Sequence, residues 1–432
     1  MEIQQPHSWY AVFSRCPEED FLNRFYLAAM TTALPIALWR LPHDDSAQAL
    51  VDLSGSYKQT ALDLEALPAG FVMAPFTHTA RESFRLLEAH LFWNGAECTL
   101  SPALKHSPAL IARGKRFLAA FVNANGRHRK ATDGAQPDPN GRFAGQVFSV
   151  SSETTKQQYC LSVENAVEKI RNAQFEKVVL ARRLDLHLPF EFEPLHLFRL
   201  LCRNYPNAFV SLVSIPGLGT WLGASPELLL SLTETQLVTV SLAGTQIPVS
   251  NSPVVWGEKE LEEQAIVSDY IRDCFVKQSI TGFTEIGPET MKIGELLHLR
   301  TKFCLRLSRN HGKQVASRLL TALHPTPAVC GVPKTESLDF IRECEAFERE
   351  FYAGYLGPVN LCSQTHLFVN LRCLQLQQQS AFLYAGAGIT KDSVPEKEWL
   401  ETELKLNSLK RFLSGAVVEP LTSSLHEREL CG

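Results

Sequence analysis

Two charged side chains lie next to apolar runs of the sequence, where burial could shift the pKa of an acid or a base. Lys177 opens the segment KVVLARRLDL, and Glu227 lies in GASPELLL, directly before three leucines. A lysine drawn into a low-dielectric cleft loses its proton easily and can act as a general base, whereas a buried carboxyl keeps its proton and can act as a general acid. The ordinary alternatives are a solvated lysine that protects a strand edge and a strand-end carboxylate in water. The two residues by themselves leave these alternatives open.

Two pairs of glutamates share one spacing. Glu260 and Glu263 lie three residues apart near the start of one predicted helix, and Glu398 and Glu401 repeat this spacing in another. Each pair therefore occupies one helix face. Carboxylates from two helices, completed by water and an anionic ligand, suit Mg²⁺, although acidic helix faces are often simply solvated and Glu401 with Lys405 has the spacing of a surface ion pair. The pairs predict a magnesium site only if the two helices meet.

A third set of residues has the chemistry to hold an anionic ring. Arginine binds a carboxylate through two parallel hydrogen bonds, and glycine backbones can present N–H groups to a second carboxylate. The candidates are Gly244 and Thr245 in LAGT, His324 in HPTPAV, Tyr352 in FYAG, Arg372 in NLRCL, and Gly386 and Gly388 in YAGAGI. Each of them has an ordinary core or turn explanation when it is considered alone.

The periodicity of the apolar residues indicates which elements position these side chains. Strands are predicted at 177–186, 208–215, 227–232 and 236–242, and a hairpin pairs 366–376 with 380–389. Helices are predicted at 80–91, 159–170, 195–202, 258–276 and 395–413. The strands come in neighbouring hairpin-like pairs and do not alternate strictly with helices. The sequence therefore predicts an α+β fold with antiparallel sheets.

The clearest break in the chain is the segment 123–142, which is rich in Gly, Pro, Asn and Asp. Such a segment buries little apolar surface and is typical of an exposed loop or linker. It separates residues 1–150 from residues 151–420, and the second part carries all the candidate site residues. A chain of 432 residues could form two average domains or one large one.

The composition excludes several classes of protein. Hydrophobic residues make up 45% of the chain, charged residues 20%, and the net charge is −4, without the basic cluster of a nucleic-acid binder. Eleven cysteines, none in a Cys-x-x-Cys pair, indicate buried thiols in a reducing compartment. The first residues lack the features of a signal peptide, and the apolar stretch 25–39 is too short to span a bilayer. We expect a soluble cytoplasmic protein, with no indication of its oligomeric state.

Taken in order, the motifs resemble those of the chorismate-utilising enzymes, which include anthranilate, aminodeoxychorismate, isochorismate and salicylate synthases. The resemblance covers residues 159–413 and rests on KVVLAR, GASPE, LAGT, the acidic helix at 260–263, HPTPAV, FYAG, YAGAGI and PEKEWLETELK. It implies one large α+β domain in which antiparallel sheets pack face to face with helices outside. Residues 1–150 would then add strands and helices to the same sheets, and 123–142 would be a surface loop.

The resemblance also implies a role for each matching residue, with chorismate as substrate and Mg²⁺ as cofactor. Lys177 matches the lysine that activates water, and Glu227 matches the acid that protonates the departing hydroxyl. Glu263 and Glu401 match metal ligands, with Glu260 and Glu398 as supporting carboxylates. Tyr352, Arg372, Gly386 and Gly388 match the carboxylate-binding set, and Gly244, Thr245 and His324 match the ring pocket.

Two positions favour water as the nucleophile. Members of the family that use ammonia resemble one another in having glutamine at the position of Lys177, and aminodeoxychorismate synthases have a nucleophilic lysine at that of Ala243. The chain looks most similar to the menaquinone-type isochorismate synthases. The alternatives are a salicylate synthase, which also eliminates pyruvate, and a silent chorismate-binding subunit. A nucleotide or nicotinamide enzyme is disfavoured because no Gly-x-Gly-x-x-Gly motif or phosphate loop is present.

The chain departs from the family pattern at four positions. Leu228 and Gln246 stand where arginine is common, and Ala173 and Cys330 stand where glycine is common. None of these changes removes a candidate catalytic or metal residue. They bear on the tuning of Glu227, and hence on rate and product.

Overall fold

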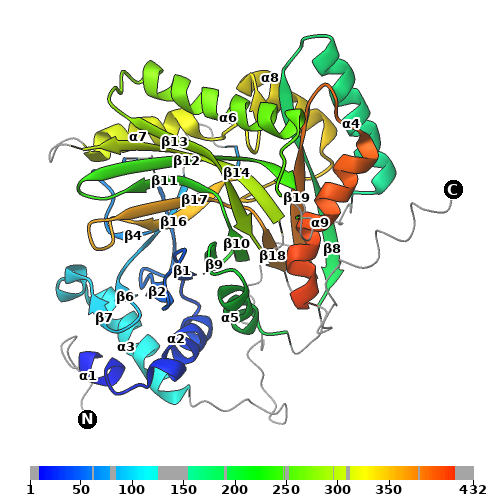
Figure 1. Ribbon diagram of the computed structural model, residues 1–432. Helices are drawn as coiled ribbons and strands as arrows, with labels where there is room; N and C mark the ends of the chain where they lie inside the picture. Colours follow the sequence, from blue (N-terminus) through cyan, green and yellow to red (C-terminus); the bar gives the residue numbers. More distant parts are fainter. Residues whose placement is uncertain are drawn as a thin grey trace.

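The fold is described from a computed structural model of the chain (Figure 1). The structure describes residues 9–60, 63–77, 84–124, 154–188, 192–246, 248, 253–294, 296–307, 312–377 and 380–413. Most of the predicted loop at 123–142 lies outside the described residues.

Two large antiparallel sheets organise the molecule. The ten-stranded sheet has the order β15 (Gly331–Val332), β8 (Lys177–His187), β19 (Ser380–Ile389), β18 (Cys373–Gln377), β10 (Gly219–Ser225), β9 (Phe209–Ile215), β1 (Ile36–Arg40), β2 (Gln48–Val51), β6 (Leu91–Trp93) and β7 (Cys98–Leu100). The nine-stranded sheet has the order β13 (Thr284–Ile293), β14 (Leu296–Arg306), β12 (Gln236–Gln246), β11 (Leu228–Leu232), β17 (Thr365–Val369), β16 (Tyr355–Val359), β4 (Gly70–Ala74), β5 (Phe84–Glu88) and β3 (Lys58–Thr60). The predicted α+β fold with antiparallel sheets is confirmed.

Helices flank these sheets (Figure 1). They are α1 (Trp9–Phe13), α2 (Glu18–Thr32), the 3₁₀ helix η2 (Pro102–Lys105), α3 (Pro108–Asn123), α4 (Lys156–Arg171), α5 (Pro194–Asn204), α6 (Glu258–Lys277), α7 (Gly312–Leu323), α8 (Lys334–Cys344) and α9 (Pro395–Leu413). Helices α6 and α7 pack on the nine-stranded sheet, and α9 packs on β19 with α4 beside it. Within the described part of the chain, no helix has the length and apolar character needed to cross a membrane.

In each sheet, strands from the early part of the chain form one end and strands from the later part form the rest, and the two groups meet at a single pair of strands. Strand β1 pairs with β9 from Ile36 opposite Ser214 to Arg40 opposite Val210. Strand β4 pairs with β16 in the same way. The first hundred residues thus share both sheets with the later segments that carry the candidate site.

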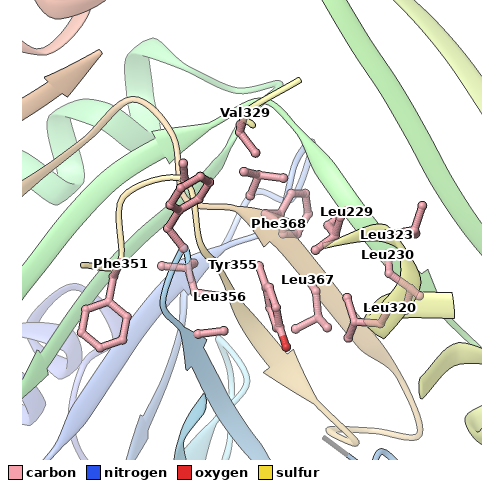
Figure 2. Packing of buried hydrophobic residues seen from close by; sticks show 14 of the residues in the cluster. Leu229, Leu230, Leu320, Leu323, Val329, Phe351, Tyr355, Leu356, Leu367 and Phe368 are labelled. Carbon is pink, nitrogen blue, oxygen red and sulfur yellow. The ribbon is translucent and has the colours of Figure 1, made fainter. Parts of the chain in front are cut away.

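The core lies between the sheets and under the helices. Figure 2 shows Leu320 and Leu323 of α7 next to Leu230 of β11, with Leu367 on the neighbouring strand. All four side chains are fully buried, and each contributes roughly 2 kcal/mol through removal of apolar area from water. This packing fixes the nine-stranded sheet against its covering helices.

Most predicted elements are found, with two corrections. Of the predicted helix 80–91, residues 80–83 lie outside the described residues, and Phe84–Glu88 form strand β5, so a helix there is wrong. Phe84, Leu86 and Leu87 are buried between β3 and β4, whose pairing overrides the local helical spacing. The predicted strand 366–376 is also wrong as a single strand. It divides at Arg372, whose φ of 46° turns the chain from β17 in one sheet to β18 in the other.

Candidate active site

Lys177 begins β8 in the interior of the protein. Its side chain has no exposed surface, and its Nζ donates a hydrogen bond of 3.1 Å to Glu263 Oε1 from α6. A solvated edge lysine is therefore the wrong interpretation. Strand β19 lies alongside, and a Cβ at Gly388 would come within 2.5 Å of Glu263 Oε1 and 3.0 Å of Lys177 Cε. Only a hydrogen atom fits at Gly388, so this glycine is what allows the lysine and the glutamate to meet beside the strand.

Glu227 lies in the bend between β10 and β11, and only 4% of it is exposed. Its carbonyl accepts a hydrogen bond from the Val369 N–H (3.0 Å), which fixes the bend against the end of β17. Burial raises the pKa of Glu227 to about 8, although the charges of Lys177 and Lys405 act to lower it. A strand-end carboxylate in water is therefore excluded. The charges of both lysines act on Glu227, so this carboxyl lies within electrostatic range of Lys177.

One lysine–glutamate ion pair joins the two acidic helices. Lys259 Nζ of α6 lies 2.6 Å from Glu398 Oε1 of α9. Within α9, Lys405 Nζ lies 2.7 Å from both Glu401 Oε1 and the Gly386 carbonyl of β19. The structure therefore brings the acidic first turns of α6 and α9 together.

Glu263 and Glu260 point to different neighbours. Burial acts to raise the pKa of Glu263, but the charges of Lys177 and Lys405 outweigh it, so this carboxyl is held ionised. Glu260 packs against the LAGT segment, since a Cβ at Gly244 would be 3.2 Å from Glu260 Cβ. Its carboxylate turns back to the start of α6, where Oε2 lies 2.6 Å from the position of a Cβ on Gly257. Glu260 thus supports LAGT from α6.

The LAGT segment contains a bulge that the sequence did not identify, and its partner is His298. The register of β12 and β14 shifts between Ala243 and Thr245, where Gly244 has a φ of 71°. His298 Nδ1 lies 3.0 Å from the Gly244 carbonyl and 3.4 Å from Thr245 Oγ1. On the other side of the ring, Nε2 lies 3.5 Å from Arg372 Nη2. His298 therefore joins the bulge to Arg372.

The protonation of His298 follows from these neighbours. Burial, followed by the positive charges of Arg372 and Lys405, lowers its pKa to about 3. The ring is neutral, so Nδ1–H donates to the Gly244 carbonyl and Nε2 accepts from the guanidinium. The signal available in the sequence was one histidine in the apolar run LLHLRT, which is equally typical of a core residue.

Tyr352 reaches β19 from the turn before β16. Its Oη lies 3.1 Å from the position of a Cβ on Gly386, and its ring stacks on Tyr384 at 5.2 Å between centroids. Burial raises the pKa of Tyr352, so its hydroxyl remains a hydrogen-bond donor. The guanidinium of Arg349 lies 5.9 Å from the centre of the Tyr352 ring.

His324 is held by another part of the structure. Its Nε2 contacts the carbonyls of Phe76 (3.1 Å) and Pro75 (3.3 Å), at the end of β4. Its ring packs edge-on against Tyr355, with centroids 4.8 Å apart. These contacts join the HPTPAV loop to β4 and β16.

Comparisons with known proteins identify the family of the chain. The sequence model of the family described as "Chorismate binding enzyme" matches residues 109–414. The chain belongs to the chorismate-binding enzyme family. The resemblance found in the motifs is thereby confirmed.

Several relatives of this chorismate-binding enzyme carry names that specify one activity. The chain is 31% identical over 285 residues to isochorismate synthase DhbC of Bacillus subtilis, covering 62% of this chain and 71% of that protein. It is 30% identical over 346 residues to the salicylate biosynthesis isochorismate synthase of Pseudomonas aeruginosa, covering 77% of this chain and 66% of that protein. The structure of MenF, the menaquinone-specific isochorismate synthase from Escherichia coli, matches with a TM-score of 0.69 at 24% identity, covering 90% of this chain and 91% of that one. That likeness confirms the fold.

The carboxylates of this chorismate-binding enzyme fit a magnesium ion by their chemistry. Glu263, Glu398 and Glu401 supply the oxygen donors that Mg²⁺ prefers. The Glu398 carboxyl is buried, and burial followed by the charge of Glu401 raises its pKa, although Lys259 and the Ser393 hydroxyl act to lower it. Among the residues that the structure describes, no three His, Cys, Asp or Glu side chains are grouped closely enough to hold an ion. Lysine ammonium groups pair with these carboxylates instead.

Two of the four departures from the family pattern have visible structural consequences. Leu228 packs with Val240, Leu242 and Ile293 in a small apolar cluster on the nine-stranded sheet. Ala173, which follows α4, has a φ of 55°, a conformation that favours glycine.

Proposed function

We propose that this chorismate-binding enzyme is an isochorismate synthase that adds water at C2 of chorismate and releases the C4 hydroxyl. The observation that carries the proposal is the burial of one amine, Lys177, and one carboxyl, Glu227, close enough for the amine to influence the carboxyl. The names of the relatives support the same reaction.

The proposed reaction uses these two side chains as base and acid. Lys177 takes a proton from water, whose oxygen forms a bond to C2 of the ring. The ring double bonds shift, and the C4–O bond breaks as Glu227 protonates the leaving hydroxyl, which departs as water. One water enters and one leaves, so substrate and product are isomers. A carboxyl with a pKa near 8 carries the required proton at neutral pH.

Lys177 needs a free lone pair to act as the base. Its Nζ donates to Glu263 at 3.1 Å, so the amine is held toward that carboxylate. We propose that Glu263 and Glu401 are the magnesium ligands, with Glu398 and Glu260 supporting them. Bound magnesium supplies positive charge that neutralises and orients a substrate carboxylate. With Glu263 holding the metal, Lys177 would be free to face the substrate.

The remaining site residues are assigned to substrate recognition. Arg372 and Tyr352 offer a guanidinium and a hydroxyl donor to carboxylates, and Gly386 and Gly388 allow the Tyr352, Lys177 and Glu263 side chains to approach β19. Thr245 and the Gly244 bulge, held by His298, line the ring pocket. We assign His324 to the wall of the pocket behind β16.

A product assay tests the proposal. Purified protein is incubated with chorismate and Mg²⁺, and the products are resolved by chromatography. Isochorismate in reversible equilibrium with chorismate is the expected result. Salicylate with stoichiometric pyruvate would identify a salicylate synthase, and the absence of any product would identify a binding subunit, so either result overturns the proposal.

A further inference from the structure

Each of three glutamates near the candidate metal site is paired with a lysine. The pairs are Lys177 with Glu263, Lys259 with Glu398 and Lys405 with Glu401. Lys177 is assigned above as the base, and Lys405 also donates to the Gly386 carbonyl. The proposed reaction leaves Lys259 without a role.

Lys259 and Glu398 form a bridge between two helices. Each lies in the first turn of its helix, and their side chains differ in exposure, with 33% of Lys259 exposed but only 1% of Glu398. Glu398 therefore places a carboxylate in the protein interior, and Lys259 reaches it from the surface. Removing that cation would leave a buried charge without compensation.

The charge of Lys259 is attracted by the whole group of carboxylates. Burial alone would lower its pKa, but Glu398 first, then Glu401 and Glu263, outweigh burial and raise it. The ammonium, paired with Glu398 at 2.6 Å, is thus attracted by the same carboxylates that are proposed to surround the divalent cation. Its four-carbon stem and partial exposure allow it to move into water, which the completely buried Lys177 cannot do.

We propose that Lys259 is a built-in counter-ion of the metal site, which holds Glu398 in the metal-free enzyme and withdraws when the divalent cation binds. This inference rests on the proposed function, because it takes these carboxylates to be the metal site. It follows that Lys259 competes with the metal. The ammonium keeps α6 and α9 together before the metal arrives, at the expense of metal affinity.

The test compares the wild type with Lys259→Met. Mn²⁺ is titrated into each protein without substrate, and free Mn²⁺ is followed by electron paramagnetic resonance, with Mg²⁺ added as a competitor. The titrations are made at about pH 8.5, well above the ordinary pKa of a glutamate, to favour the ionised form of the carboxyl released from Lys259. We expect Lys259→Met to bind Mn²⁺ about fivefold more tightly, since it loses a partly exposed ionic competitor.

A second measurement separates competition from a purely structural role. In EDTA, Lys259→Met should melt at a lower temperature than the wild type, and saturating Mg²⁺ should raise its melting temperature by more. The matched control is Lys391→Met, which also removes one positive charge. Lys391 forms a solvent-exposed ion pair with Glu262, and Glu262 lies in α6, the helix that carries Lys259. The control should leave Mn²⁺ affinity within twofold of the wild type.

The outcomes are distinct. If the wild type binds Mn²⁺ and Lys259→Met binds it equally or more weakly, the counter-ion proposal is overturned while the metal site stands. If the wild type itself binds no divalent cation, the proposed metal site fails, and the counter-ion role fails with it. Equal tightening in Lys259→Met and Lys391→Met would show a general charge effect and also overturn the proposal.

Discussion

At the scale of single residues, the chemistry of Glu227 depends on how costly its ionisation is inside the protein. Its pKa of about 8 lies above the ordinary value because burial penalises the carboxylate. The proposed reaction needs the protonated form. A rise in pH through 8 removes that proton, so we expect kcat/KM to fall by about tenfold per pH unit well above 8.

The measurement is a pH profile of kcat/KM for chorismate at saturating Mg²⁺. Glu227→Gln should lower kcat by roughly 10²–10⁴-fold at every pH, since an amide keeps the shape and loses the acid. A variant with more than a tenth of wild-type activity would remove Glu227 from its assigned role.

Gly388 gives a prediction that depends on space alone. A methyl group there would lie 2.5 Å from Glu263 Oε1 and 3.0 Å from Lys177 Cε, so Gly388→Ala must displace one of them. We expect turnover to fall by roughly 10²-fold or more, because small displacements of reacting groups are costly. Gly217→Ala is the control, since nothing lies within 4 Å of its added methyl group and its positive φ affects only stability. Similar activity in both variants would contradict the assigned geometry.

Ala173 gives a prediction about stability. Its φ of 55° is strained for a residue with a Cβ. Ala173→Gly relieves the strain in the folded state but increases the conformational entropy of the unfolded chain. The free energy of unfolding should therefore rise by about 0.5–1 kcal/mol. Chemical denaturation of the two proteins measures the difference, and a loss of stability would show that the αL conformation is not strained here.

The two histidines show the limit of sequence reasoning at this scale. His324 was assigned to the ring pocket from its motif, whereas His298, which bridges Gly244 and Arg372, was overlooked. A histidine in an apolar strand can be recognised as part of a site only when the strand register is known and places it opposite a bulge. The carboxylate pairs were easier to find, because helical spacing alone puts Glu263 and Glu401 on defined helix faces.

At the scale of elements, α9 is the helix whose position matters most, because it carries Glu398, Glu401 and Lys405. Arg182 of β8 contacts three residues of α9 and anchors this helix. Its guanidinium lies 3.8 Å from the centre of the Trp399 ring, Nε donates to Thr402 Oγ1 at 2.7 Å, and Nη2 pairs with Glu403.

Arg182→Met should therefore lower the free energy of unfolding by about 2–3 kcal/mol, through loss of a stacked and hydrogen-bonded buried cation. It should also weaken divalent-cation binding, because α9 loses its anchor. Arg342→Met is the control, since Arg342 pairs with Asp339 at the surface, where the two side chains are 60% and 61% exposed, and its loss should cost less than about 1 kcal/mol. Denaturant unfolding measures both, and equal losses would contradict the anchoring role.

Local patterns predicted α9 at 395–413 and strand β8, because amphipathic spacing and apolar runs decide such elements. The residues of β5 were predicted as helix, because Phe84, Leu87 and Leu91 also fit a helical face. The partners that make β5 a strand are β3 and β4, and no local window contains that pairing. The same reason explains why one continuous strand was predicted through Arg372.

At the scale of the whole molecule, each sheet contains strands from residues 1–150 and strands from residues 151–420. Without the first part, β9 would lose β1 and β16 would lose β4. We therefore expect residues 151–420, expressed alone, to aggregate or bind hydrophobic dyes without a cooperative unfolding transition. A soluble fragment with a sharp transition would mean that the later residues fold independently. Co-expression with residues 1–150 serves as the rescue control.

The pairing of β4 with β16 has a consequence for biosynthesis. Strand β4 ends at Ala74, and its partner begins at Tyr355. At the usual speed of translation, roughly 15–60 seconds pass on the ribosome between the emergence of the two. During that interval one edge of the apolar segment GFVMA has no strand to pair with, and it is exposed to other nascent chains. The yield of usable enzyme in a cell will then depend on chaperone capacity during synthesis, more than on the stability of the finished protein.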